Sequence, residues 1–271
     1  MNLSSQMDYS SCFINSPMRP VLMLNHFTNV FLLPLFIFIL YAAFGQTSSF
    51  THSDMFTFHM AAIELIGVAA SVMQVHAMLA KLPHMIILGS KFFYLTWFGQ
   101  VFFHALTCVD RYLAVVHPVT YLGLRQSQGV RLRNIIIAGV WLFCILQAIV
   151  LKHGMFAIIV DNIILCSALI VVAFCSLSVL YSLIGPGRGS KCRNKINQSK
   201  RRAFLTIVVI LGVLFLRLIC SQTVKLVSIV VYPFNFTHCV LIGIETITGL
   251  PSSLVLPLLF LHKTWPVPCC Q

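Results

Sequence analysis

The chain has 271 residues, of which 59% are hydrophobic and only 9% are charged. A water-soluble domain cannot bury so large an apolar share, so the composition excludes that class and indicates a protein that crosses a lipid bilayer several times. The formal net charge is +12. The cations gather in two stretches between apolar runs, as in the cytoplasmic loops of membrane proteins, and we therefore expect no nucleic-acid partner.

Apolar runs long enough to span a bilayer occur seven times along the chain. They predict an all-α membrane protein, a seven-transmembrane helix bundle. An extracellular tail (1–19), a seven-helix domain (20–262) and a short cytoplasmic tail (263–271) make up the chain. Pro34 should kink the first span. The predicted spans are residues 20–44, 54–79, 85–116, 133–151, 155–183, 203–231 and 239–261.

The two basic loops set the predicted orientation. Residues 125–133 and 188–202 carry several Lys and Arg and not one acidic residue. Basic loops stay on the cytoplasmic side, so the N-terminus should lie outside and the C-terminus inside. Asn2 and Asn235 each begin an Asn-x-Ser/Thr glycosylation pattern, and both fall on the predicted outer side.

An acid–base pair closes the third predicted span, in the triplet Asp110-Arg111-Tyr112. Charge deep in a bilayer is costly, whereas a pair at a helix mouth is tolerated. Neighbouring residues differ by about 100° around a helix, so Arg111 is free to reach away from Asp110. On composition alone, the pair is also compatible with an ordinary basic stop signal at a cytoplasmic helix end.

The residues around this triplet, 106–118, read Leu-Thr-Cys-Val-Asp-Arg-Tyr-Leu-Ala-Val-Val-His-Pro. This run resembles the third-helix signature of rhodopsin-like (class A) G-protein-coupled receptors. Residues 60–65 are similar to the family's second-span motif, with Glu64 in place of Asp. Trp141 stands where the fourth span usually has a Trp, and residues 256–260 keep only the Pro of Asn-Pro-x-x-Tyr. Within the family, residues 111–125 are most similar to a divergent set of fish receptors.

The resemblance implies a multi-pass receptor of the plasma membrane and not an enzyme. Such a receptor transduces an extracellular signal to a cytoplasmic heterotrimeric G protein. Asp110, Arg111 and Tyr112 would carry the coupling. The acid that pairs with this Arg in the family is absent, since Lys200-Arg201-Arg202 stands in its place on the sixth span. We therefore expect signalling without ligand.

Other departures leave alternatives open. The outer end of the third span has no Cys for the family's usual disulfide. Residues 219–222 read Ile-Cys-Ser-Gln where the family has Cys-Trp-x-Pro. A non-signalling decoy or degenerate seven-helix protein is the first alternative. A small-solute transporter is the second, and the lack of an internal repeat argues against it.

The resemblance also implies a cation or proton site at Glu64, with Gln100, Ser252 and Ser253 beside it. The family's carboxylate at this place holds a sodium ion; no other cofactor is expected. The residues alone allow a second interpretation, because burial favours the uncharged form of a carboxyl group. In that interpretation a neutral Glu64 is hydrogen-bonded to Asn29 or Ser252.

Polar residues recur every fourth position on the sixth span and form one stripe along it. Arg217 lies near mid-membrane, where an ionisable residue is a functional candidate. One interpretation is a pocket for an acidic extracellular ligand. The other is an internal ion pair, with Glu245 facing Lys225, that fixes the bundle. The candidate pocket residues are Lys91, Tyr94, Arg217, Ser221, Lys225 and Glu245.

The ten cysteines show no metal-ligand spacing, so we expect no metal site. By the predicted topology only Cys12 and Cys239 lie near the oxidising outer face, and they form a candidate disulfide; the alternative is an unpaired Cys12 on a mobile tail. Cys269 and Cys270 are candidate palmitoylation sites. His59 and His104 should be packed, hydrogen-bonded core residues rather than ligands.

Overall fold

The computed structural model describes residues 19–45, 54–124, 126–150, 155–184, 212–213, 215–224, 226–227, 239–241, 243–249 and 253–254. Within these residues the regular structure is entirely helical, which confirms the predicted all-α class. The main helices are α2 (Arg19–Phe31), α3 (Leu33–Gly45), α4 (Asp54–Ala80), α5 (Pro83–Val116), α6 (Pro118–Leu124), α7 (Ser127–Val150) and α8 (Met155–Ile184).

Five helical stretches are long and apolar enough to cross a membrane, so the protein is a membrane-embedded helical protein. They also expose large apolar side chains, such as Ile170, which is 68% exposed, and lipid is the solvent that suits such a surface. Two shorter apolar helices, Phe215–Val224 and Cys239–Gly249, lie within the predicted sixth and seventh spans. The five long stretches are Arg19–Tyr41, Phe58–Ala80, Pro83–Val116, Ser127–Ile149 and Ile159–Ser182.

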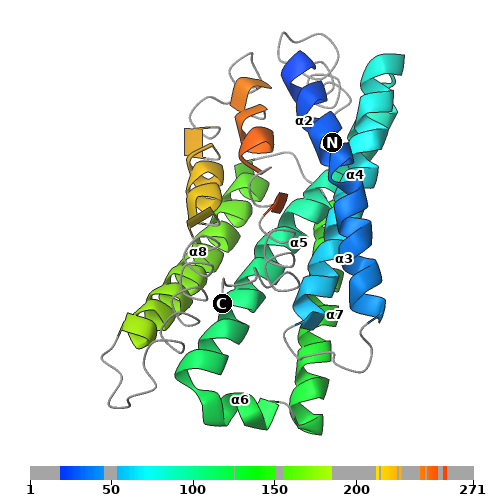
Figure 1. Cartoon of the computed structure of the whole chain (residues 1–271). Coiled ribbons are helices and arrows are strands. Elements are labelled where there is room, and N and C mark those ends of the chain that lie inside the picture. Colours follow the sequence, from blue (N-terminus) through cyan, green and yellow to red (C-terminus); the bar gives the residue numbers. More distant parts are fainter. Residues whose placement is uncertain are drawn as a thin grey trace, which may run out of the picture.

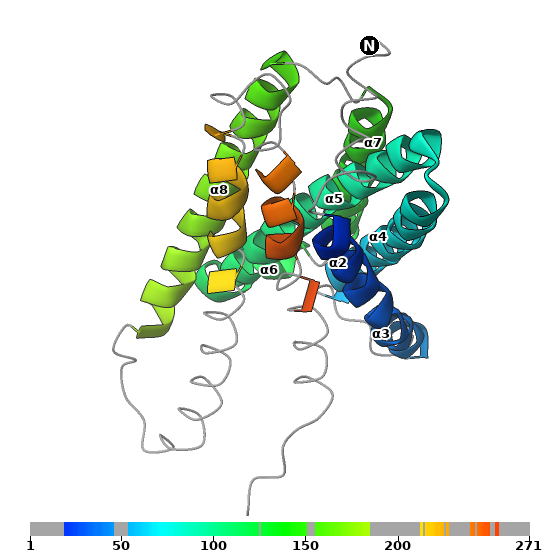
Figure 2. The same ribbon diagram turned by 90° about the horizontal axis from the view of Figure 1, so that it is seen from above.

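Helix α5 runs through the middle of the bundle (Figure 1). It packs against α4, α6, α7 and α8, and α4 in turn carries α2 and α3. Seen from above, α8 lies on one side of α5, with α2, α3, α4 and α7 on the other (Figure 2). The helix Cys239–Gly249 lies between the helix Phe215–Val224 and α2 in both views. A side chain on α5 can therefore meet partners from several other elements.

Glycines let α4 and α5 approach closely. A Cβ atom built at Gly99 of α5 would lie 2.5 Å from Cδ1 of Ile63 on α4. One built at Gly67 of α4 would lie 2.8 Å from Cγ2 of Thr96 on α5. Neither position has room for a side chain, because the two backbones approach as closely as small residues allow in membrane helix pairs.

The turn between α4 and α5 is tight. Lys81 takes a left-handed backbone conformation with φ 53°. The N–H of Leu82 then donates to the carbonyl of Ala77 at 2.9 Å, which closes the end of α4. Pro83 opens α5, where its missing N–H costs no helical hydrogen bond. The predicted boundaries of these two spans agree with the structure to within a few residues.

The first span bends as predicted. Helix α2 ends at Phe31 and α3 begins at Leu33, so Leu32 forms the break. Pro34 stands in the first turn of α3, where it cannot donate a hydrogen bond back into α2. The N–H of Leu32 donates to the carbonyl of Asn29 at 3.1 Å and keeps the chain turning through the break.

The segment between the third and fourth predicted spans, expected to be a loop, is largely helical. Residues Pro118–Leu124 form α6, and α7 begins at Ser127, six residues before the predicted start of the fourth span. Proline fixes φ near the helical value and is favoured at a first helical position, so Pro118 starts α6 readily. The positive charge of this segment predicts a loop, but basic residues such as Arg131 are also stable in the first turns of a helix at the membrane surface.

An aromatic cluster fills the contact between α4, α5 and α7. The ring of His59 is stacked on Phe103 with ring centroids 5.6 Å apart. Nε1 of Trp141 donates to Nδ1 of His59 at 3.3 Å. His59 is thus packed and hydrogen-bonded, as expected from the sequence, but it is half-buried rather than a fully buried core residue.

Candidate functional site

Four polar side chains from distant parts of the chain meet inside the bundle, and we call them the central cluster: Glu64, Gln100, Arg217 and Ser253. Gln100 is the centre. Its Nε2 donates to Oε1 of Glu64 at 2.7 Å and to Oγ of Ser253 at 3.3 Å. Its Oε1 accepts a hydrogen bond from Nη2 of Arg217. All four side chains are buried, at 4–6% exposure.

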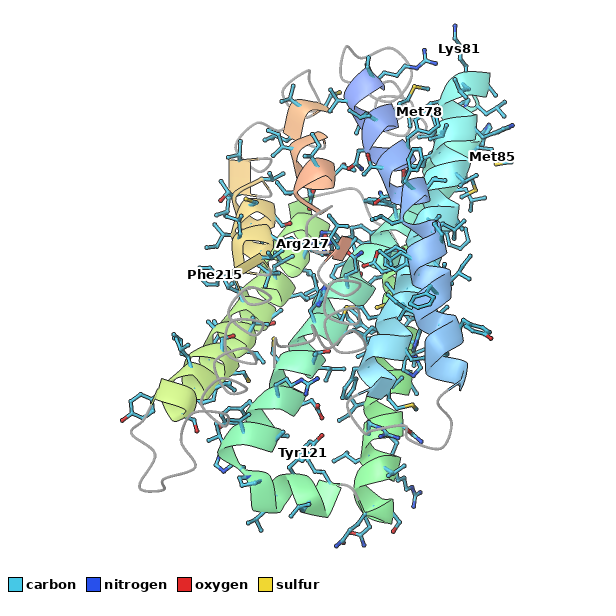
Figure 3. The ribbon with its side chains drawn as sticks, in the orientation of Figure 1. Met78, Lys81, Met85, Tyr121, Phe215 and Arg217 are labelled. Carbon is cyan, nitrogen blue, oxygen red and sulfur yellow. The ribbon has the colours of Figure 1, made fainter. Side chains whose placement is uncertain are left out.

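Opposite charges balance each other in this cluster. Arg217 and Glu64 attract each other, and Glu245 adds a second attraction to Arg217. Figure 3 shows Arg217 extending from its short helix into the bundle, whereas Phe215, two residues away, lies on the outside. A buried ion survives in an apolar interior only when it is paired and hydrogen-bonded, and Arg217 and Glu64 meet both conditions.

His104 lies one helical turn from Gln100, within electrostatic range of Arg217. It is 5% exposed, and among the described residues no group hydrogen-bonds to its Nε2 atom. The expectation of a packed histidine holds for its burial. The expectation of a hydrogen-bonded one does not hold for this nitrogen.

The sequence had assigned Glu64 and Arg217 to two separate sites, a cation site and a ligand pocket. The structure joins them through Gln100. The alternative in which Asn29 hydrogen-bonds to Glu64 is wrong, because Nδ2 of Asn29 donates to Oγ of Ser71 at 3.4 Å. The other candidate partner, Ser252, lies outside the described residues, while Ser253, also predicted beside Glu64, takes part in the cluster.

A second polar cluster lies nearer the end of the bundle that holds Lys81, and we call it the Tyr94 cluster. The hydroxyl of Tyr94 donates to Oδ2 of Asp161 on α8. Nε2 of Gln222 donates to Oδ1 of Asn162 at 2.7 Å. Glu245 lies within electrostatic range of Tyr94. The cluster therefore connects α5, α8 and the helices of the predicted sixth and seventh spans.

Sequence reasoning missed Asp161, Asn162 and Gln222. A signal for the first was present, because an Asp inside an apolar run is a functional candidate by itself. Of the other predicted pocket residues, Ser221 is buried at 2% exposure and Lys91 is half-buried. Lys225 lies outside the described residues, and so does its predicted pairing with Glu245.

A third polar group, also missed, joins α2, α4 and α5. Nδ1 of His26 and Oγ of Ser71 are 3.3 Å apart, and Nε2 of Gln74 donates to Oγ of Ser90 at 3.1 Å. Beside His26, the Asn25 amide is 3% exposed, and no described group hydrogen-bonds to it. These contacts fix α2 against α4 and hold α4 to α5.

The adjacent residues of the triplet near the end of α5 point in different directions around the helix and therefore differ in burial. Asp110 is buried at 6% exposure and Arg111 is exposed. The hydroxyl of Tyr112 and Nε2 of His117 are 3.1 Å apart, and the Tyr112 ring packs on Phe174 of α8 with centroids 5.6 Å apart. Tyr112 thus anchors the end of α5 to α8, while Arg111 is left accessible where α5 leads into α6.

Cys239 forms a disulfide bond. The other cysteines among the described residues are free thiols, so none of them is its partner: Cys108, Cys144, Cys166, Cys175 and Cys220. The described residues also contain no group of His, Cys, Asp or Glu that could hold a metal ion. The remaining predicted sites lie outside the described residues: Cys12, Asn2, Asn235, Cys269 and Cys270.

No protein-family model matches the chain, and no curated protein matches it in sequence. Its own residues and their geometry therefore carry the functional argument.

Proposed function

We propose that the protein is a rhodopsin-like G-protein-coupled receptor. It crosses the plasma membrane seven times with its N-terminus outside and transmits an extracellular signal to a heterotrimeric G protein. The observation that carries the proposal is the state of the triplet in its Leu-Ala-Val-Val-His-Pro context: Asp110 is buried and Arg111 is exposed at the end of the central helix. The burial of the acid and the accessibility of the guanidinium fit a docking contact for a partner protein better than they fit a simple stop signal.

Helix dimensions support this position for Arg111. At 1.5 Å per residue, the 34 residues of α5 extend about 50 Å, well beyond the roughly 30 Å of bilayer hydrocarbon. Gln100 lies near the middle of α5. If it marks the bilayer centre, then Arg111, eleven residues further on, lies about 16 Å away, at the edge of the hydrocarbon. A cytoplasmic protein can reach a guanidinium at that depth.

The seven-span layout and the orientation rest on supporting observations of different kinds. The short apolar helices Phe215–Val224 and Cys239–Gly249 lie within the sixth and seventh predicted spans, which supports the seven-span layout. Arg131 is exposed in the first turns of α7, at the same end of the bundle as Tyr121 of α6, which Figure 3 labels. Basic residues gathered at one end favour that end as cytoplasmic.

The Tyr94 cluster is the candidate ligand site, since it lies on the opposite side of the central cluster from Arg111. Its charged members are the carboxylates of Asp161 and Glu245. Arg217, which the sequence had offered as the anchor for an acidic ligand, is engaged by Gln100. The binding of an acidic ligand would therefore depend on the positive charges of Lys91 and Lys225.

One observation favours the second candidate function, a non-signalling decoy. Arg217 ties the helix of the sixth span to Gln100 of α5, and activation in the resembled family requires that span to swing outward. The missing Trp and Pro at residues 219–222 remove the usual means for that movement.

A nucleotide-exchange experiment separates the two functions. Membranes from cells that express the chain are given purified G proteins of each class and a slowly hydrolysed GTP analogue, without ligand. Analogue uptake above that of membranes lacking the chain is the expected result. Surface-expressed protein that stimulates no G protein, with or without candidate ligands, would support the decoy.

A further inference from the structure

The central cluster contains the oxygen atoms that hard cations prefer, from a carboxylate, an amide and a hydroxyl. The resemblance stated above implies a sodium ion at this place. Whether these residues fit such an ion depends on which atoms of Gln100 face Glu64 and Ser253. In this structure they are the hydrogens of the Gln100 amide, which donate to both oxygens.

Arg217 fixes this orientation of the amide. A guanidinium has donors and no acceptors, and an ionised carboxylate has acceptors and no donors. The Gln100 amide can satisfy both neighbours in one way, with its oxygen toward Arg217 and its nitrogen toward Glu64. Turning it over would set donor against donor and acceptor against acceptor. With Arg217 in place, the amide oxygen is therefore turned away from Glu64.

The charge balance of the central cluster also argues against a bound sodium ion. Glu64 is buried at 4% exposure, and a buried carboxylate needs a compensating charge. Arg217, buried at 6%, supplies it from within the chain. A metal cation added to this pair would put extra positive charge beside Arg217 in an apolar interior, and Glu245, the other acid that attracts Arg217, is only half-buried. The residues present do not fit a sodium ion.

We propose that Arg217 is the built-in cation of the central cluster, so that the wild-type protein binds no sodium there, and that removing the guanidinium creates a sodium site from Glu64, Gln100 and Ser253. Without Arg217, the Gln100 amide is free to turn its oxygen toward the carboxylate. The proposal does not depend on G-protein coupling, because it concerns the binding of an ion.

The test is thermal unfolding of the purified full-length protein in detergent, followed by tryptophan fluorescence. Sodium chloride is compared with choline chloride at equal concentration. Wild type should melt at the same temperature in both salts. Arg217→Met should melt higher in sodium, by about 2–4 °C when sodium exceeds its dissociation constant several-fold. Adding Glu64→Gln to Arg217→Met should abolish that difference.

Two controls separate the charge from the side chain that carries it. Arg217→Lys keeps a cation in the cluster and should stay insensitive to sodium. Arg131→Met removes an exposed arginine and should also show no sodium effect. Arg217→Gln, a smaller change in polarity, replaces Arg217→Met if the latter does not fold. Wild type that is stabilised by sodium over choline would overturn the proposal, and so would a folded Arg217→Met or Arg217→Gln with no sodium response.

Discussion

Arg217 and Gln100, which are 117 positions apart in the chain, are hydrogen-bonded inside the bundle, and Gln100 also donates to Glu64. This relationship connects three predicted spans through a single amide. It also makes the charges of Glu64 and Arg217 dependent on each other, since each is buried and neither has solvent to replace its partner.

The first prediction concerns that dependence. Glu64→Gln and Arg217→Met should each lower the stability by on the order of 3 kcal/mol, because each leaves one buried charge uncompensated. The double variant should lose less than the sum, by roughly 1–3 kcal/mol. Thermal unfolding in detergent measures all four proteins. Combining Glu64→Gln with Arg19→Met, a change at the far end of α2, should be additive; additivity for the Arg217 pair as well would contradict the coupling.

The second prediction tests the close approach of α4 and α5. Gly99→Ala should destabilise the protein by about 1–3 kcal/mol, because the added methyl group would lie 2.5 Å from Cδ1 of Ile63. Ile63→Val removes that atom and should recover part of the loss. Gly139→Ala is the matched control: nothing lies within 4 Å of its added Cβ, and alanine favours a helix by up to about 1 kcal/mol. Equal effects of the two alanines would refute the packing argument.

The third prediction identifies the disulfide partner of Cys239. On the predicted topology, that partner is Cys12 of the extracellular tail. Peptide mapping without reductant should recover the Cys12 and Cys239 peptides as one species that separates on reduction. Cys220, a free thiol in the structure, should be recovered alkylated in the same digest. A cross-link from Cys239 to any other cysteine would overturn the assignment.

The fourth prediction concerns orientation. The cations of the basic segments 125–133 and 188–202 favour a cytoplasmic position for both, which leaves Asn235 outside. Glycosidase treatment should shift the gel mobility of wild type, and shift that of Asn235→Gln less. Asn197-Gln198-Ser199 is a third glycosylation pattern and lies in the basic loop. A glycan on Asn197 would reverse the predicted topology.

The positions of the helices along the chain could be predicted from the sequence better than the contacts between helices. Hydrophobic runs and proline positions were enough for α4, α5 and the bend at Pro34, since these depend on local chemistry. The contact between Arg217 and Gln100 depends on how each helix is rotated about its own axis, which periodicity along one helix does not reveal. That is why Glu64 and Arg217 were assigned to different sites.

Two other differences have local explanations. The basic residues that follow α6 predict a loop there, whereas Pro118 at its start favours the helix that the structure shows. Asp161 carried a signal of its own, a carboxylate inside an apolar run, but its partner Tyr94 comes from another helix. Only packing could connect them, and it also showed that Asp110 and Arg111, adjacent in sequence, differ in burial.

The most direct measurement of the central proposal is ligand-free nucleotide exchange by the Arg111→Ala variant, beside wild type and Arg131→Ala. Arg111 is exposed, so its removal should leave folding and surface expression near normal. Exchange should fall to the level of membranes without the chain, whereas Arg131→Ala should keep most of its activity. Wild-type exchange that survives in Arg111→Ala at equal surface expression would contradict the assignment of Asp110-Arg111-Tyr112 as the G-protein contact.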